Sequence, residues 1–183
     1  TNTPMAFWYV ALLTALWGGL LTLERRAFLQ AMFSRPLVAA IGTGLLVHDL
    51  EAGVYIGLVF ELFHLGSASL GGSHPDHETL PSVMAVALAA ALGHAGGSSS
   101  TLAVWSLAIL LMAPMGQLGA LVETRIDERA RKYAGRAQDA IDHGDTKGVG
   151  RQNLRAMWPQ FVAFGLLSGS GLLLGRALNG PYL

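Results

Sequence analysis

Apolar residues along this chain fall into long runs separated by short polar stretches. Residues 6–23 form a run of 18, which as a helix covers about 27 Å and is long enough to cross the hydrocarbon core of a bilayer. Residues 101–122 and 157–174 form runs of at least that length, and Pro114 and Gly116 interrupt the former. This pattern predicts helices that span a membrane.

Two further apolar runs are too short to span a bilayer. Residues 37–47 and 83–93 contain 11 residues each, and polar stretches follow both. Such runs are typical of discontinuous helices that line a transport site, although ordinary helices with irregular boundaries would give a similar pattern. Backbone that leaves the helix at membrane depth must be covered by protein or water. We therefore expect an all-α polytopic membrane protein with four or five full spans and additional broken or re-entrant helices.

The stretch between the first run and Pro36 has a mixed character. Its apolar residues share one helical face, and the opposite face carries Arg25, Arg26 and Gln30. An amphipathic pattern of this kind is typical of a helix that lies in the membrane interface. We expect a short interfacial helix here, ended by Pro36.

Charge is concentrated in one segment. Only 13% of the residues are charged, about half the share of a typical soluble domain, and 14 of the 24 charged residues lie within residues 123–155. Residues 123–143 combine an apolar stripe with oppositely charged pairs four residues apart, which predicts an amphipathic helix in water. Because the segment holds eight Lys and Arg residues, it should face the cytoplasm, either as a solvated surface or as a docking surface for a partner. We expect residues 1–183 to form a single membrane domain with a cytoplasmic helical loop at about 123–155.

The composition argues against several classes of protein. The net charge is zero and no basic stripe with interleaved aromatic residues occurs, so the sequence does not indicate nucleic-acid binding. The chain has no cysteine, which excludes disulfides and zinc–thiolate sites. The first apolar run lacks a preceding basic region and a cleavage motif of small residues, so we interpret it as a retained span.

The stretch "FELFHLG", residues 60–66, places two ionisable residues within an apolar segment. Glu61 and His64 are three residues apart and would share a helical face. An isolated charge at mid-membrane costs about 3 kcal/mol, so such residues pair with each other or face a polar interior. One interpretation is a Glu61–His64 hydrogen bond that joins two helices. The hypothesis adopted here is a polar site for a substrate or protons.

Other polar candidates occur near this pair in the sequence. Carboxylates and amides bind paired hydroxyls as acceptors and donors, which suits a sugar. The same residue types also suit a metal, because Glu61 and His64 form half of a di-iron pattern and residues 74–78 ("HPDHE") could supply further ligands. A second Glu-x-x-His is missing from the sequence. A metal-binding membrane protein or membrane oxidoreductase that uses Glu61, His64 and the His74–Glu78 loop is therefore the alternative hypothesis.

Several motifs occur in an order that resembles a known family. An acidic residue and a glutamine precede Arg35-Pro36, an apolar stretch leads to Asp49, and Glu61-Leu62 and Pro75-Asp76 follow. The later stretch "APMGQLGALVETRIDERARKYA" adds a Pro-then-Gly-Gln helix that runs into a charged one. Together these motifs resemble the IIC membrane subunits of the mannose/fructose/sorbose-type sugar phosphotransferase system, over most of residues 18–170.

The resemblance implies a transport subunit rather than an enzyme, located in the bacterial inner (cytoplasmic) membrane. It implies a hexose substrate, a IID membrane partner, a cytoplasmic IIB (IIAB) phosphocarrier that phosphorylates the sugar, a complex that forms a homo-oligomer, and no cofactor or metal. The substrate-binding residues carried over from the family are Glu24, Gln30, Glu61, Ser69 and Asp76, with His48, Asp49 and His64 as secondary polar residues.

Three features depart from the family pattern. Ser69 stands at a position where relatives can carry a larger amide. His48 replaces the glycine that usually precedes the aspartate, which leaves the preferred sugar open. Family members also usually continue for several apolar segments beyond the point where this sequence stops.

Overall fold

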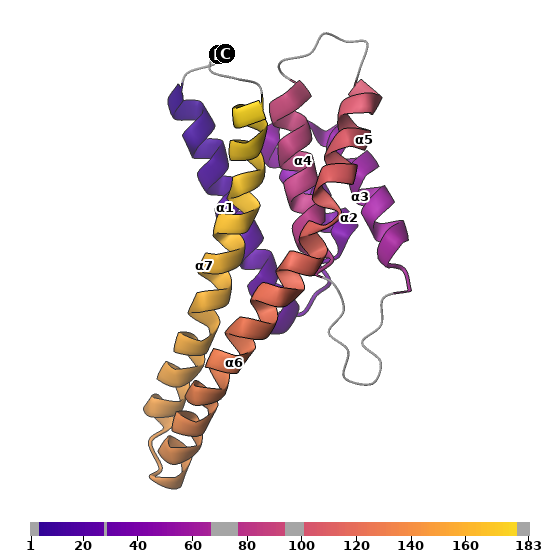
Figure 1. Ribbon diagram of the computed structural model, residues 1–183. Coiled ribbons are helices and arrows are strands. Elements are labelled where there is room, and N and C mark those ends of the chain that lie inside the picture. Colours follow the sequence, from indigo (N-terminus) through magenta and orange to yellow (C-terminus); the bar gives the residue numbers. More distant parts are fainter. Residues whose placement is uncertain (1–3, 28, 67–76, 94–100, 179–183) are drawn as a thin grey trace.

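The computed structural model describes residues 4–27, 29–66, 77–93 and 101–178, and the regular structure within these ranges is entirely α-helical (Figure 1). The helices are α1 (Pro4–Arg26), α2 (Pro36–Val47), α3 (Leu50–His64), α4 (Thr79–Gly93), α5 (Thr101–Met112), α6 (Met115–Asp142) and α7 (Thr146–Leu178). The expected all-α fold is confirmed.

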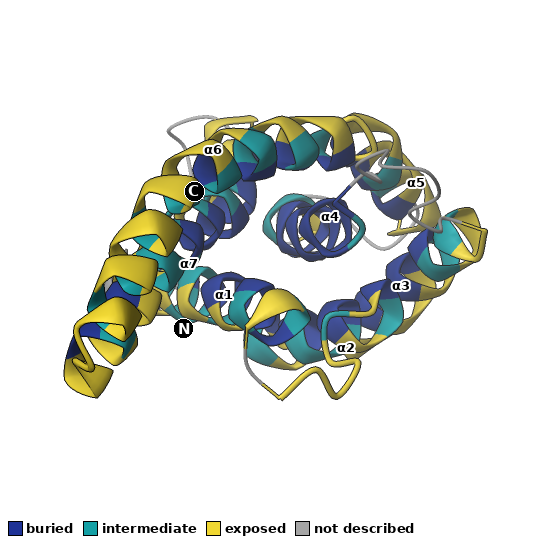
Figure 2. Ribbon diagram, turned by 90° about the horizontal axis from the view of Figure 1, so that it is seen from below, coloured by how far each residue is buried: buried dark blue, intermediate teal, exposed yellow. Residues whose placement is uncertain are grey.

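Helix α4 lies at the centre of the bundle. Figure 2 shows it enclosed by the other helices, and every residue from Thr79 to Ala90 is buried. A helix that is apolar on all faces is stable only where other apolar surface surrounds it. The sequence of α4 fits this position, because it contains five alanines and no charged residue, so neighbouring helices can approach it from every side.

Close contacts between helices depend on glycine. A Cβ atom added at Gly171 of α7 would lie 2.9 Å from the carbonyl oxygen of Met84 in α4. A Cβ atom added at Gly165 would lie 2.9 Å from the carbonyl oxygen of Ala15 in α1. Because α7 presents glycine to both neighbours, it can pack its backbone directly against α1 and α4.

Helices α2 and α3 form a hairpin that turns back within the bundle. They contain 12 and 15 residues, about 18 and 22 Å, which is less than the thickness of a bilayer core. At the turn, His48 adopts a left-handed conformation (φ 60°) and caps α2. The side chain of Asp49 then accepts a hydrogen bond from the backbone N–H of Ala52 (3.1 Å), which caps α3. The apolar run at 37–47 is therefore one arm of a helical hairpin, and it is too short to span a bilayer, as its length predicts.

Helices α6 and α7 project beyond the bundle as a long antiparallel hairpin (Figure 1). Helix α5 ends at Met112, and after Pro114 the helix α6 continues from Met115 to Asp142. This confirms both the interruption at Pro114 and the amphipathic helix predicted at 123–143. Helix α7 begins earlier than the predicted span because Asp145 Oδ1 accepts a hydrogen bond from the N–H of Gly148 (2.9 Å) and so starts the helix at Thr146.

Within the described residues, three helical segments are long and apolar enough to cross a membrane: Phe7–Arg26, Thr101–Asp142 and Thr146–Leu178. The prediction of four or five full spans is wrong for this part of the chain, because α2, α3 and α4 are all too short.

The predicted interfacial helix before Pro36 is also wrong. Helix α1 continues to Arg26, and the residues that follow form a loop in which Leu29, Gln30 and Met32 have positive φ angles. Pro36 starts α2 rather than ending a helix, because a proline at the first helical position lacks only an N–H that would be unpaired there anyway.

Aromatic and basic side chains, of which Trp8, Trp158 and Arg176 are exposed and Arg25 is partly buried, mark two levels on the bundle. At one end, the guanidinium of Arg176 lies 4.7 Å from the ring centre of Phe7, beside the exposed Trp8. At the other end lie Arg25 and the exposed Trp158. The helical rise along α1 from Trp8 to Arg25 is about 26 Å. The rise along α7 from Trp158 to Arg176 is about 27 Å. These distances match the hydrocarbon thickness of a bilayer, with aromatic and basic residues at its edges.

We predict that Gly171→Ala destabilises the fold. The added methyl group would meet the backbone of Met84, 2.9 Å from its carbonyl oxygen, and overpacking of this kind costs about 1–3 kcal/mol. The matched control is Gly150→Ala in the same helix, where nothing lies within 4 Å and alanine gains about 0.5–1 kcal/mol of helix propensity. Thermal unfolding in detergent should therefore show a lower melting temperature for Gly171→Ala and an equal or higher one for Gly150→Ala. Equal shifts for both variants would contradict the close packing of α4 against α7.

Candidate functional site

Glu24 lies in the last turn of α1 and is buried, with 7% of its surface exposed. Its Oε2 atom accepts a hydrogen bond from the backbone N–H of Ser34 at 2.9 Å. Its Oε1 atom is also buried and has no hydrogen-bond partner among the described residues. The carboxylate also lies close to the backbone N–H groups of Ala31 and Phe33, so it holds the loop after α1, while Oε1 makes no hydrogen bond of good geometry there.

Glu61 lies in the last turns of α3 and is half-buried. Its Oε1 atom forms an ion pair with Arg35 Nη2 at 2.8 Å, and its Oε2 atom accepts a hydrogen bond from the N–H of Leu37 at 3.2 Å. Leu37 is in the first turn of α2, where backbone N–H groups lack partners within the helix and favour a negative charge. The carboxylate of Glu61 thus caps a neighbouring helix.

The two carboxylates converge on one short segment at the start of α2. Glu24 binds Ser34, and Glu61 binds Arg35 and Leu37. A third helix reaches the same segment, because the hydroxyl of Thr79 in α4 donates to the carbonyl oxygen of Ser34 at 2.6 Å. The structure therefore brings two of the predicted site residues together, through a segment whose role the sequence pattern did not reveal.

The remaining predicted residues are dispersed or lie outside the described ranges. Gln30 is exposed and its amide lies 3.5 Å from the carbonyl oxygen of Arg26. His48 and Asp49 sit at the opposite end of α3 from Glu61, about 18 Å away along the helix. The ring of His64 donates from Nδ1 to the carbonyl oxygen of Phe60 at 2.8 Å. Ser69 and Asp76 lie outside the described residues.

His77, just before α4, is a buried polar residue of the 74–78 stretch, which the sequence offers both as a source of polar groups for a sugar and as a metal loop. It is 1% exposed and its ring stacks on Phe164, with the ring centres 4.3 Å apart. Its Nδ1 atom accepts a hydrogen bond from the N–H of Leu80 at 3.2 Å, whereas its buried Nε2 atom has no partner among the described residues. Nothing in the local sequence indicates this burial, which results from contacts with distant helices.

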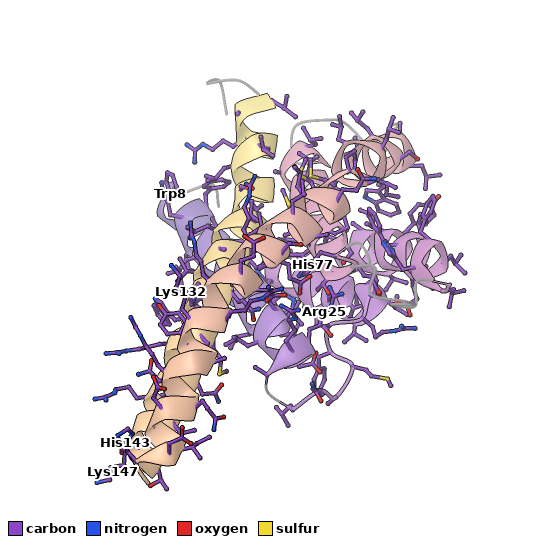
Figure 3. The ribbon with its side chains drawn as sticks, turned by 60° about the horizontal axis from the view of Figure 1, so that its bottom comes forward. Trp8, Arg25, His77, Lys132, His143 and Lys147 are labelled. Carbon is purple, nitrogen blue, oxygen red and sulfur yellow. The ribbon has the colours of Figure 1, made fainter. Side chains whose placement is uncertain are left out.

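Arg25 lies near His77, and Figure 3 shows both side chains at the same end of the bundle. The Nη1 atom of Arg25 is buried and has no hydrogen-bond partner in the described part of the chain. Burial, and after it the positive charge of Arg25, lowers the pKa of His77 to about 3. The imidazole is therefore neutral at physiological pH.

Arg26 connects α1 to the projecting hairpin. Its guanidinium forms two hydrogen bonds to the carboxylate of Asp127, at 2.7 and 2.9 Å. Its Nε atom also lies 3.2 Å from Oε1 of the buried Glu123. A guanidinium held in this way by two carboxylates has a fixed orientation, so the end of α1 and the middle of α6 are held together.

The described residues contain no group of three or more His, Asp or Glu side chains that could hold a metal ion. Glu61, the central residue of the metal hypothesis, is engaged by Arg35 and the N-terminus of α2. His74 and Asp76 of the proposed metal loop lie outside the described residues.

Comparisons with known proteins point to one family. The family model described as "PTS system sorbose-specific iic component" matches residues 8–178. A cryo-EM structure of the mannose transporter ManYZ in complex with microcin E492 (MceA) is similar in fold, with a TM-score of 0.75 and 18% sequence identity. The match covers 98% of this chain and 65% of that chain, so this chain is considerably shorter than the transporter chain. No curated protein matches the sequence.

We predict that Thr79→Val destabilises the start of α2. Valine has nearly the shape of threonine but cannot donate to the carbonyl oxygen of Ser34, and an unpaired buried group costs about 1–3 kcal/mol. Chymotrypsin should consequently cut the loop after Phe33 faster, and the melting temperature in detergent should fall. The control is Thr124→Val, whose hydroxyl donates to the Ala120 carbonyl oxygen of its own helix. Equal cleavage of both variants would show that Thr79 does not fix this loop.

Proposed function

Because this chain belongs to the family of sorbose-specific IIC components of the phosphotransferase system, we propose that it is the sugar-permeating IIC membrane component of a mannose-type system. In this role it binds a hexose and passes it inward for phosphorylation by a separate protein. The observation that carries the proposal is the family match over residues 8–178. The buried carboxylate of Glu24, whose Oε1 atom makes no hydrogen bond of good geometry among the described residues, supports it.

Within this function, Glu24 and Glu61 are the central residues of the hexose site. Carboxylate oxygens accept hydrogen bonds from sugar hydroxyls. At the edge of the bilayer core, a bound sugar would replace water as the partner of these carboxylates. Glu61 is oriented by Arg35, and both carboxylates are held by the segment that starts α2. Gln30, Ser69 and Asp76 complete the proposed site, with His48, Asp49 and His64 as secondary polar residues.

The proposed partners are a IID membrane subunit and a cytoplasmic IIB (IIAB) phosphocarrier. The structurally similar chain belongs to the mannose transporter ManYZ, and this chain spans 65% of its length. Large apolar side chains are exposed on α1, α3 and α5, where lipid or other membrane subunits would cover them. Transport then proceeds by alternating access against IID, within a complex that forms a homo-oligomer. The phosphoryl group is carried by IIB, so the residue that transfers it is on another subunit.

The proposed location is the bacterial inner membrane, with the α6–α7 hairpin in the cytoplasm. Residues 123–155 hold eight Lys and Arg residues, and such residues favour the cytoplasmic side. The labelled side chains of this hairpin are Lys132, His143 and Lys147 (Figure 3). Trp8 lies near the start of α1, whereas the hairpin contacts the last residue of α1, Arg26. The hairpin is the proposed cytoplasmic part of a single membrane domain.

We predict that Glu61→Gln reduces hexose uptake at least tenfold in cells that also express the IID and IIB partners. Glutamine can still accept the hydrogen bond from Leu37, so α2 remains capped, but the charge that pairs with Arg35 is lost. The control is Glu51→Gln, an exposed acid in the first turn of the same helix, which should transport normally. Intact uptake and binding by Glu61→Gln would refute the assignment of this residue to the site.

Cysteine labelling tests the orientation directly, because the chain has no native cysteine. We expect Lys147→Cys, near the tip of the hairpin, to react with a membrane-impermeant maleimide only after spheroplasts are lysed. Ala177→Cys, at the other end of α7, should react in intact spheroplasts. The opposite labelling pattern would place the hairpin outside the cytoplasm.

A further inference from the structure

Three buried polar atoms at one end of the bundle lack hydrogen-bond partners among the described residues: Glu24 Oε1, Arg25 Nη1 and His77 Nε2. We propose that these atoms form a hexose subsite in which Arg25 and His77 donate hydrogen bonds to sugar oxygens while Glu24 accepts one from a hydroxyl. This inference rests on the proposed function and adds Arg25 and His77 to its site.

The hydrogen bonds of His77 determine which atom can donate. Because Nδ1 accepts from the N–H of Leu80 (3.2 Å), a neutral ring carries its proton on Nε2. The ring is held by stacking on Phe164 and is 1% exposed, so this N–H cannot reach bulk water. An unpaired donor in such a place is unfavourable and would be satisfied by a ligand with an acceptor oxygen.

Contacts connect the three groups. Glu24 binds Ser34, and Ser34 in turn accepts a hydrogen bond from Thr79, two residues after His77. Arg25 is adjacent to Glu24 at the end of α1, and its side chain lies at the same end of the bundle as His77 (Figure 3). The three atoms therefore belong to one region, where α1 meets the start of α4.

The mixture of donors and an acceptor favours a neutral polyhydroxyl ligand. A phosphate or carboxylate would suit Arg25 and His77, but the free carboxylate oxygen of Glu24 would repel it. A sugar hydroxyl can donate to Glu24 through its proton and accept through its oxygen, and a hexose offers several such groups. An inorganic anion is therefore the less suitable occupant.

Two substitutions at His77 distinguish its role as an acceptor for the N–H of Leu80 from its proposed role as a donor to the ligand. In His77→Asn, the shorter side chain can still accept from Leu80, as asparagine does at many helix N-termini, but the donor at the position of Nε2 is lost. In His77→Gln, the longer side chain places an amide donor near that position. The control is His143→Asn, the same change at an exposed site on the hairpin.

The full chain, purified with its membrane partner in lipid nanodiscs, is titrated calorimetrically with mannose, fructose and sorbose in separate experiments. We expect His77→Asn to bind about tenfold more weakly, which corresponds to one lost hydrogen bond, while His77→Gln and His143→Asn stay within about threefold of the unmodified protein. Arg25→Met, which removes a donor on another helix and leaves the start of α4 intact, should also weaken binding about tenfold or more. Melting temperatures confirm that each variant is folded.

The outcomes are distinguishable. If the unmodified complex binds mannose, fructose or sorbose and His77→Asn and Arg25→Met bind it equally well, the subsite is wrong and the proposed function stands. If inorganic phosphate binds and these variants abolish only that binding, the region is an anion site and the inference is overturned. If the unmodified complex binds none of mannose, fructose and sorbose, the proposed function fails and this inference fails with it.

Discussion

The structure depends on the burial of α4 on all sides. A helix with small apolar side chains and no charge makes the same favourable contacts in every direction, so the other helices can arrange themselves around it. In lipid the gain comes from close packing rather than from the removal of apolar surface from water. Glycine in α7 provides that closeness, because the backbone of α7 meets the backbone of α4 at Gly171.

The central position of α4 also determines where polar groups can lie. His77, just before α4, and the first residue of α4, Thr79, are enclosed by protein rather than by lipid. The exposed N–H groups at the start of α2 present a related problem, because a short helix that begins near the bilayer edge needs acceptors. Glu24 and Glu61 provide these acceptors, for the N–H groups of Ser34 and Leu37, and the hydroxyl of Thr79 donates to the carbonyl oxygen of Ser34. A rearrangement of any of these helices would therefore change the candidate site.

The end of the bundle where α1 meets the start of α2 also carries the connection to the α6–α7 hairpin. Arg26, next to Arg25, is bound by Asp127 and by the buried Glu123 of α6. Glu24, Arg25 and Arg26 are consecutive, so one turn of α1 contacts the start of α2, the region of His77 and the hairpin. The proposed hexose site and the proposed cytoplasmic surface are thus joined by short, direct contacts rather than through the length of the bundle.

Much of the local structure follows from the sequence. The lengths of the apolar runs predict the long α1 and α7 and the short α2 and α4, although they overestimate the number of full spans, which is three among the described residues. Pro114 predicts the interruption before α6, and the charge pattern predicts the amphipathic helix that follows. The order of motifs around Glu24 and Glu61 also identifies the family. These features depend on residues close together in the chain, where helical periodicity and helix-breaking residues act directly.

Only the tertiary structure decided how these helices are arranged and which side chains meet. The sequence does not predict that Glu61 binds Arg35 or that His77 is buried against Phe164, because these pairs lie far apart along the chain. Nor does it predict the loop in place of an interfacial helix, which Glu24 and Thr79 hold from other helices. The physical reason is that lipid is as apolar as the protein interior, so hydrophobicity alone does not distinguish a central helix from a lipid-facing one. That distinction comes from shape and from specific hydrogen bonds, which exist only after the helices have packed.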